Sequence, residues 1–239
     1  MLFTVRPTRQ AASNVFQKGL KKCPNSIPLW LSAAHLEEQM NGPSRARATL
    51  AQARTKNPKN ADLWLATVRL EARVGKAEAV GEGAMKSAEA NMARALQECP
   101  TSGTLWAEYI MMVPKPQRRA KSVEALKRCD HDPYVIAMVS HLFWADRKIE
   151  NARKWFTRAI TLAPDIGDFW ASFYKFELQH GVEEQQTELV KKCVETEPKH
   201  GEQWTRVVKA VENAHLGTEA ILKKVAAHMG KEEEKGAAA

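Results

Sequence analysis

The chain has 239 residues, of which 44% are hydrophobic and 27% charged, with 12 glycines and 11 prolines. This balance is that of a folded protein able to bury a core, and it excludes disordered and fibrous classes. The net charge of +8 lies at one end, because residues 1–60 hold ten basic and two acidic side chains. Such an end attracts phosphates or acidic protein surfaces, and a merely solvated surface is the alternative.

The beginning of the chain, MLFTVRPTRQ, has no apolar run behind its positive charges, so no secretory signal is predicted. The longest apolar stretch, residues 134–145, has 12 residues and predicts a buried helix, because it is too short to cross a bilayer. The four cysteines form no C-x-x-C pair (Cys23, Cys99, Cys129 and Cys193). They predict small buried side chains in a reducing compartment, without a zinc site or disulfide.

An internal period runs from about residue 24 to residue 204. Prolines stand at positions 24, 58, 100, 133, 164 and 198, and the sixth residue after each is Trp30, Trp64, Trp106, Val139, Trp170 and Trp204. Two amphipathic stretches lie between successive prolines, and each proline ends one helix and begins the next turn. The predicted unit is therefore an antiparallel helix pair of about 34 residues, which must stack on its neighbours to bury its apolar stripe.

The number of units predicts an all-α, right-handed α-solenoid with one continuous core. Half a unit at about residues 8–22 precedes six helix pairs, giving a single domain over residues 1–229 and a disordered charged tail at 230–239. Extra residues at 75–87 are expected in a loop or a longer helix. Because solenoids normally begin with a capping unit, the initial half unit predicts a fragment of a longer protein.

The repeat assigns a set of apolar side chains to the core. The stretch DFWASFYKFELQHG places its aromatic residues in one arc of a helix, which is typical of a buried face. The side chains predicted in the core are Trp30, Trp64, Trp106, Phe156, Trp170, Phe173, Phe176 and Trp204.

The residues around each tryptophan separate two classes of helical repeat. A tetratricopeptide unit needs a small residue four positions after the tryptophan and a tyrosine seven after it. Here bulky residues prevail at the first position, and Glu37, Glu71 and Glu177 stand at the second. The pattern W-x5-[FLM]-E, followed by A-R-x-x-[FL]-x-x-A at Ala46 and Ala152, resembles the half-a-TPR (HAT) repeat.

Longer stretches carry a more specific resemblance. PQRRAKSVEALKRCDHDP and FYKFELQHG resemble the C-terminal HAT-repeat region of the pre-mRNA-processing factor six family of spliceosomal tri-snRNP proteins. The resemblance implies a nuclear scaffold that bridges the U5 and U4/U6 particles by contacts with other snRNP proteins, as a monomer within a large ribonucleoprotein. Contact with snRNA backbone is left open. It implies no membrane partner, small-molecule substrate or reaction.

The sequence offers no chemistry that would suggest an enzyme. GKAEAVGEG departs from a P-loop because Leu70 replaces the first glycine and Ala77 the metal-binding hydroxyl. The seven histidines include no H-E-x-x-H motif. Catalytic, cofactor-binding and metal-ligating residues are therefore all predicted to be absent, and no cofactor is expected.

Basic clusters remain as candidate partner-binding sites, with a solvated face as the alternative. The stronger cluster is expected to form a ridge that holds phosphates or acidic peptides, and it comprises Lys115, Arg118, Arg119, Lys121, Lys127 and Arg128. The second comprises Arg45, Arg47, Arg54, Lys56 and Lys59, where Arg47 could pair inside the stack. Two other functions stay open. One is a helical-repeat protein that reads RNA bases, although no polar residue recurs at the same position of every repeat. The other is a homodimeric HAT adaptor in another complex.

Overall fold

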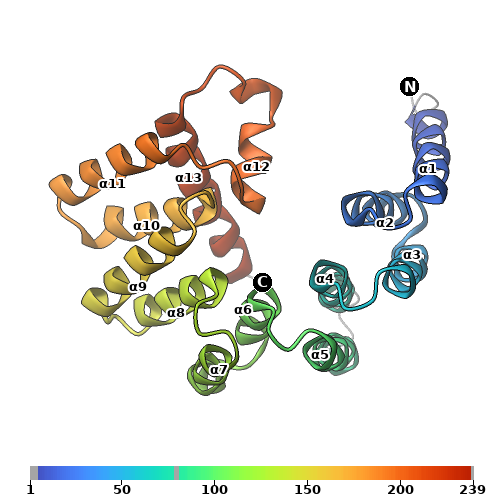
Figure 1. Ribbon diagram of the computed structural model, residues 1–239, viewed down its shortest axis with the longest axis horizontal. Coiled ribbons are helices and arrows are strands. Elements are labelled where there is room, and N and C mark those ends of the chain that lie inside the picture. Colours follow the sequence, from blue (N-terminus) through green and yellow to red (C-terminus); the bar gives the residue numbers. More distant parts are fainter. Residues whose placement is uncertain (1–4, 78–80, 238–239) are drawn as a thin grey trace. The chain divides into compact units, whose positions relative to one another are not determined.

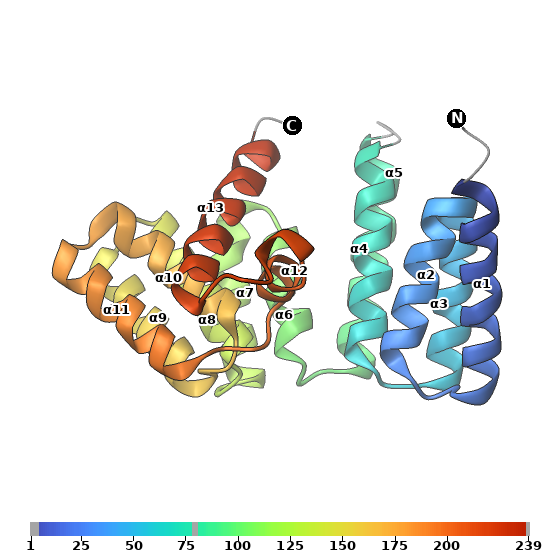
Figure 2. The same ribbon diagram turned by 90° about the horizontal axis from the view of Figure 1, so that it is seen from above.

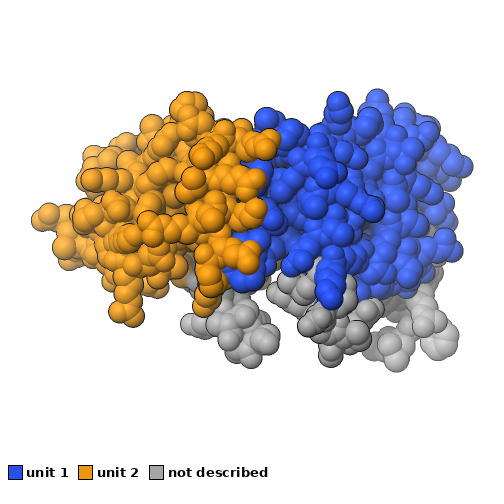
Figure 3. All heavy atoms as spheres, turned by 90° about the horizontal axis from the view of Figure 1, so that it is seen from below, with its two compact units in different colours: residues 1–114 blue, residues 115–239 orange. Residues whose placement is uncertain are grey.

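The computed structural model describes residues 5–77 and 81–237, with side chains over 11–75 and 86–229. Over this part the chain forms thirteen α-helices and one 3-10 helix, without a strand (Figure 1). It divides into two compact units, residues 1–114 and residues 115–239, which Figure 3 shows in different colours. The predicted all-α class is confirmed.

The helices follow one another with short connections. Unit 1 holds α1 (Val5–Lys22), α2 (Ile27–Asn41), α3 (Pro43–Lys56), α4 (Ala61–Ala77), α5 (Gly81–Glu98) and α6 (Gly103–Met112). Unit 2 holds α7 (Lys115–Arg128), α8 (Pro133–Ala145), α9 (Ile149–Leu162), α10 (Gly167–His180), α11 (Glu183–Thr196), α12 (Glu202–Val208), the 3-10 helix η1 (Val211–Asn213) and α13 (Thr218–Ala237). Helix α1 is thus the initial half unit. The pairs within unit 1 are α2/α3 and α4/α5, and those within unit 2 are α8/α9, α10/α11 and α12/α13. Figure 2 shows α1 to α5 side by side.

Two segments differ in length from the rest of the repeat. The extra residues at 75–87 lengthen both helices of the second pair, because α4 has 17 residues and α5 has 18; residues 78–80 lie outside the described part. The disordered tail predicted at 230–239 is corrected in part, since α13 continues to Ala237. Lysine, glutamate and alanine are all strong helix formers, so this stretch can extend an existing helix.

The proline–tryptophan spacing has a hydrogen-bonding cause. In three pairs the indole Nε1 donates to the carbonyl oxygen of the proline six residues earlier, at 2.7 Å for Trp30, 2.9 Å for Trp106 and 2.7 Å for Trp170. Trp64 instead donates to Glu98 Oε2 at 3.1 Å. The turn is thus tied to the helix that follows it. All eight side chains assigned to the core are buried, with exposed fractions of 7% or less.

The turn before α8 corrects the assignment of one proline. Asp132 caps α8, and its amide donates to the carbonyl of Cys129, just as capping Ser102 donates to Cys99 before α6. Asp130 therefore takes the turn position of the other prolines, while Pro133 is the first residue of the helix. Ile136, fully buried, stands at the tryptophan position in place of Val139. A proline suits the first helical turn as well as the turn before it, so the proline spacing predicted the wrong register for this repeat.

Neighbouring pairs meet closely at the start of α10. The amide of Gly167 donates to the carbonyl of His200 at 2.7 Å, and a side chain at Gly167 would overlap the ring of Trp204. Next to it, the Asp168 carboxylate accepts from the amides of Gln203 and Trp204 at 3.2 and 2.7 Å. Asp168 therefore caps α12 from the preceding pair.

The buried side chains form separate clusters in the described part of unit 1. Leu63 of α4 belongs to a cluster with Trp30 and Leu50, whereas the next residue, Trp64, belongs to one with Met92 and Leu105. The prediction of one continuous core is corrected here, because successive residues of α4 pack on opposite neighbours. Unit 2 has a larger cluster centred on Phe156 and Phe176.

Three of the four cysteines are buried as predicted, and all four are free thiols. Cys23 is the exception, because it is exposed at the end of α1. The equivalent Cys99 follows α5, which packs on α4, whereas no described helix precedes α1.

Candidate partner-binding surface

The six basic residues of the predicted ridge lie on α7 but do not share one face. The buried side of α7 carries Ser122 and Ala125, and the buried Cys129 follows directly after the helix. Arg118 lies four residues before Ser122, on that same side, and is half-buried, while Lys121 donates to Glu124 Oε2 at 2.9 Å. The other four cationic side chains are exposed: Lys115, Arg119, Lys127 and Arg128. The ridge therefore has four exposed cationic residues in place of the six that the sequence suggests.

An arginine–glutamate pair recurs between successive helix pairs. Arg47 of α3 donates from Nε and NH2 to the two carboxylate oxygens of Glu71 in α4, at 2.7 and 2.9 Å. Arg153 of α9 makes the same two bonds to Glu177 of α10, at 2.7 and 3.1 Å. This hydrogen bonding raises the pKa of Arg153. The HAT signature residues thus join neighbouring pairs, and Arg47 pairs with a glutamate of the next helix pair, as the sequence suggested, although its side chain is 40% exposed.

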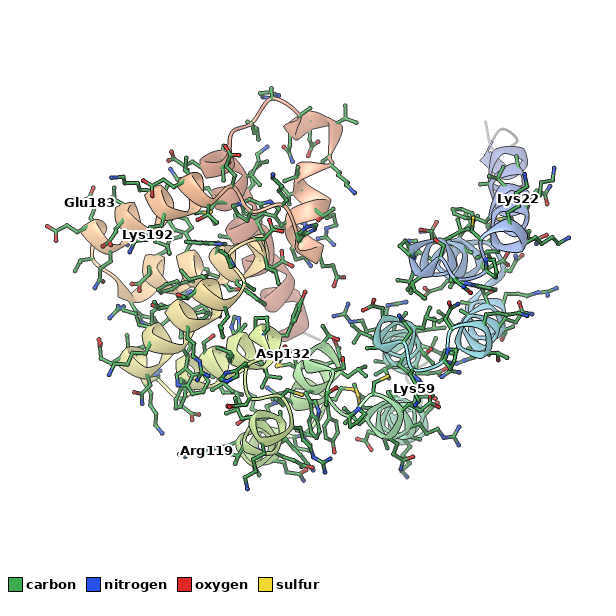
Figure 4. The ribbon with its side chains drawn as sticks, in the orientation of Figure 1. Lys22, Lys59, Arg119, Asp132, Glu183 and Lys192 are labelled. Atoms are coloured by element: carbon green, nitrogen blue, oxygen red, sulfur yellow. The ribbon has the colours of Figure 1, made fainter. Side chains whose placement is uncertain are left out.

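Arg119 stands at the arginine position of this signature. It lies ten residues before Cys129, as Arg47 lies ten before Asn57 and Arg153 ten before Ala163, at the same turn. The acceptor, 24 residues further on, is a glutamate in both pairs but Phe143 after Arg119. Phenylalanine offers no carboxylate, and Arg119 is exposed on α7 (Figure 4). Its guanidinium is therefore directed to solvent.

The neighbourhood of Phe143 contains aromatic residues that the sequence reasoning missed. The rings of Phe143 and Trp155 lie 6.0 Å apart, and both side chains are half-buried. Lys148 lies 6.0 Å from the centre of Phe143, and Arg158 lies 5.3 Å from that of Trp155. The sequence did hold a signal for this aromatic pair, because Trp155 falls outside the periodic tryptophan series and so has no core position assigned to it.

A groove in unit 1 shows how these positions relate to one another. It lies along α1, α2 and α3, has a volume of about 780 Å³, and its lining includes Ser13, Lys21, Glu37, Thr49 and Gln52. By register, the corresponding residues of α7, α8 and α9 are Arg119, Lys127, Phe143, Trp155 and Arg158. Helix α7 packs on α8, and α8 on α9. We call these five residues the α7–α9 surface; it combines cations with half-exposed aromatic rings.

The second basic cluster is divided by the fold. Arg45 and Lys56 line the groove of unit 1, and Arg47 is paired with Glu71. Arg54 lies over the ring of Trp64, with its guanidinium carbon 4.0 Å from the ring centre, and burial lowers its pKa. Lys59 is exposed in the turn before α4 with a left-handed φ of 58°. Only part of this cluster can therefore meet a partner.

Other kinds of site are not evident in the described residues. Among them, no three histidine, cysteine or acidic side chains are placed to hold a metal ion. Within the same residues, no helix is long and apolar enough to span a membrane.

The sequence is similar to curated splicing factors. It is 36% identical to pre-mRNA-splicing factor prp1 of Schizosaccharomyces pombe over 92% of the chain. It is 54% identical to human pre-mRNA-processing factor 6 over 47% of the chain and 59% identical to Protein STABILIZED1 of Arabidopsis thaliana over 50%. The chain is a HAT-repeat region of the pre-mRNA-processing factor 6 kind. It spans 12 to 23% of the length of these relatives, and no protein-family model matches it.

Solved structures support the fold alone. The chain resembles a tetratricopeptide-repeat protein of Thermus thermophilus with a TM-score of 0.53 at 15% identity, over 71% of this chain and 91% of that one. It resembles a chain of the Cut9–Hcn1 assembly of the APC/C with a TM-score of 0.52 at 11% identity, over 91% of this chain and 42% of that one. The predicted TPR-like α-solenoid class is thereby confirmed.

Proposed function

We propose that this region is a non-catalytic scaffold in nuclear pre-mRNA splicing, which bridges the U5 and U4/U6 particles of the tri-snRNP by contacts with other proteins. The observation that carries the proposal is that Phe143 stands at the position where two other repeats have a glutamate that binds the signature arginine. The repeat pairs its signature arginine with a glutamate at Arg47 and Arg153, whereas the equivalent Arg119 is exposed and its acceptor position holds Phe143, which belongs to an aromatic pair. The names of the relatives support the splicing context.

The chemistry of the α7–α9 surface favours an acidic protein segment as its partner. Arg119, Lys127 and Arg158 supply positive charge, and an arginine can hold a carboxylate through two parallel hydrogen bonds. Phe143 and Trp155 supply apolar contact area, the kind of residue that carries most binding energy at interfaces. RNA is the less suitable partner, because Lys148 and Arg158 already lie over the rings on which bases would stack.

The proposal can be tested by capture from nuclear extract with the full 239-residue chain as bait. We expect the wild-type chain to recover tri-snRNP proteins, and the R119E/K127E variant to lose most of them while its circular dichroism is unchanged. The control, K191E/K192E, makes the same charge change on exposed residues of α11 and should capture normally. Wild-type bait that recovers no tri-snRNP component would overturn the scaffold proposal.

Two further measurements separate the alternative functions. Ribonuclease treatment before capture should leave the recovered proteins in place; their loss would favour direct RNA binding. Sedimentation of the purified chain should give a monomer, whereas a dimer at micromolar concentration would favour the homodimeric HAT adaptor.

A further inference from the structure

The groove along α1, α2 and α3 has an apolar floor, which α1 and α2 supply. Phe16 and Leu20 of α1 and Leu36 of α2 line it, and all three side chains are partly exposed. Trp30 and Ala33 lie beneath them and are buried. Its volume of about 780 Å³ lies within the range of sites that bury a ligand. Apolar side chains in a concave surface gain free energy when a partner removes them from water.

The rim of this groove is basic. Lys21, Arg45 and Lys56 line it from α1 and α3, and all three are exposed. Residues 1–60 hold only two acidic side chains, Glu37 and Glu38. Glu38 is held outside the groove by two bonds from Arg73, at 3.2 and 2.8 Å. The field at the rim is therefore positive.

The remaining carboxylate lies in the lining of the groove. Glu37 occupies the signature position of Glu71 and Glu177, but its partner position holds Ser13 in place of an arginine. Ser13 Oγ donates to Oε1 at 3.1 Å, and Asn41 Nδ2 donates to Oε2 at 2.7 Å. Among the side chains that the structure describes, these two neutral donors hold the Glu37 charge. Ser13, Glu37 and Asn41 all line the groove at the place where Arg47 and Arg153 bind their glutamates in later repeats.

We propose that this groove binds an acidic amphipathic helix of a partner protein. The apolar side of that helix packs on Phe16, Leu20 and Leu36, and its carboxylates meet Lys21, Arg45 and Lys56. A helix with its side chains is about 10 Å across and packs into the furrow between two neighbouring helices. The apolar floor and the Glu37 carboxylate both disfavour a nucleic-acid backbone. This surface lies in unit 1 and does not rest on the proposed role of the α7–α9 surface.

The test uses a designed probe and the full chain. The probe is a fluorescein-labelled helical peptide of about five turns, with leucine along one face and glutamate along the other, since helices shorter than that are marginal in water. Fluorescence anisotropy gives its dissociation constant. A peptide of the same composition in scrambled order controls for charge alone, and a single-stranded RNA labelled in the same way tests the other class of polyanion.

The chain offers matched variants for this test. R45E/K56E reverses two cations of the rim, whereas K22E/K59E reverses two exposed lysines outside the groove lining, both labelled in Figure 4. We expect the first variant to weaken peptide binding at least about tenfold and the second less than about twofold, because only close charge pairs contribute strongly. Thermal unfolding of both variants should match that of the wild type.

Three outcomes would overturn the proposal. The helical peptide could bind no better than its scrambled form, the two variants could weaken binding equally, or RNA could bind more tightly with the same loss in R45E/K56E. The last result would assign the groove to nucleic acid. Each outcome is independent of capture from nuclear extract, so failure of this proposal and failure of the scaffold proposal are distinguishable.

Discussion

The guanidinium of Arg153 in α9 donates to both carboxylate oxygens of Glu177 in α10, at 2.7 and 3.1 Å. The Glu177 side chain is only 2% exposed, whereas that of Arg153 is 21% exposed. Because the carboxylate is buried, its charge depends on this partner, and the pair joins one helix pair to the next.

Removing the arginine should therefore destabilise unit 2 strongly. We expect Arg153→Met to lower the free energy of unfolding by about 2–3 kcal/mol, since it leaves the Glu177 charge buried without its partner. Urea denaturation measures this loss. Lys192→Met breaks an exposed pair with Glu188 on α11 and should cost about 0.5 kcal/mol or less. Equal losses in the two variants would contradict the internal role of the signature pair.

A methyl group at Gly167 should be poorly tolerated. Its side chain would overlap the ring of Trp204, which is 2% exposed and has little room to move. We expect Gly167→Ala to cost about 2–3 kcal/mol, in the range of core overpacking. Gly217 has no atom within 4 Å of the corresponding position, so Gly217→Ala should change the unfolding free energy by less than about 0.5 kcal/mol. Thermal denaturation of both variants decides between a steric and a merely conformational role for Gly167.

Trp170 combines core volume with a hydrogen bond, and two substitutions separate them. Trp170→Ala should cost about 3–5 kcal/mol through lost burial and a cavity. Trp170→Phe keeps much of the ring but removes the donor to Pro164, and should cost about 1–3 kcal/mol. A tryptophan-to-phenylalanine change without measurable loss would show that the proline carbonyl does not need its indole partner.

The buried thiol of Cys193 should make stability depend on alkaline pH. Burial raises its pKa from 9.0 to about 12. The folded chain then keeps a proton that the unfolded chain loses, so this contribution is complete below pH 9 and declines as pH rises toward 12. Its slope is at most about 1.4 kcal/mol per pH unit.

Urea unfolding at several pH values between those limits checks the prediction. Cys193→Ala should reduce the alkaline slope, whereas Cys23→Ala, at an exposed thiol, should not. A thiol reagent should modify Cys23 quickly and Cys193 only on unfolding. Rapid modification of Cys193 in the folded chain would contradict its burial.

Periodicity made most of the fold predictable. The tryptophan series located the helix pairs because all five indoles are buried at the same place in the repeat, and three of them also donate to the carbonyl of the preceding proline. Residue 133 shows the limit of that reasoning: proline suits both the turn and the first helical position, and only the carbonyl of Cys129, bonded to Asp132, identifies the register.

The candidate surface was less predictable than the core. The density of positive charge in the sequence pointed to α7, but it could not show that Arg118 is half-buried or that Lys121 is paired with Glu124. Trp155 was visible in the sequence as a tryptophan out of series, yet its proximity to Phe143 depends on how α8 packs on α9. Contacts between helices, unlike positions along one helix, are not encoded by spacing alone.

The exchange of glutamate for Phe143 also suggests how such a protein could acquire new partners. Changing the residue at the acceptor position removes the partner of the signature arginine, so the charge on the surface can change through a substitution at a half-buried position. Conversely, Phe143→Glu would be expected to offer Arg119 the carboxylate that Glu71 offers Arg47, and so to weaken the surface while leaving its three cationic residues unchanged. A search for interface mutations confined to exposed positions would overlook that route.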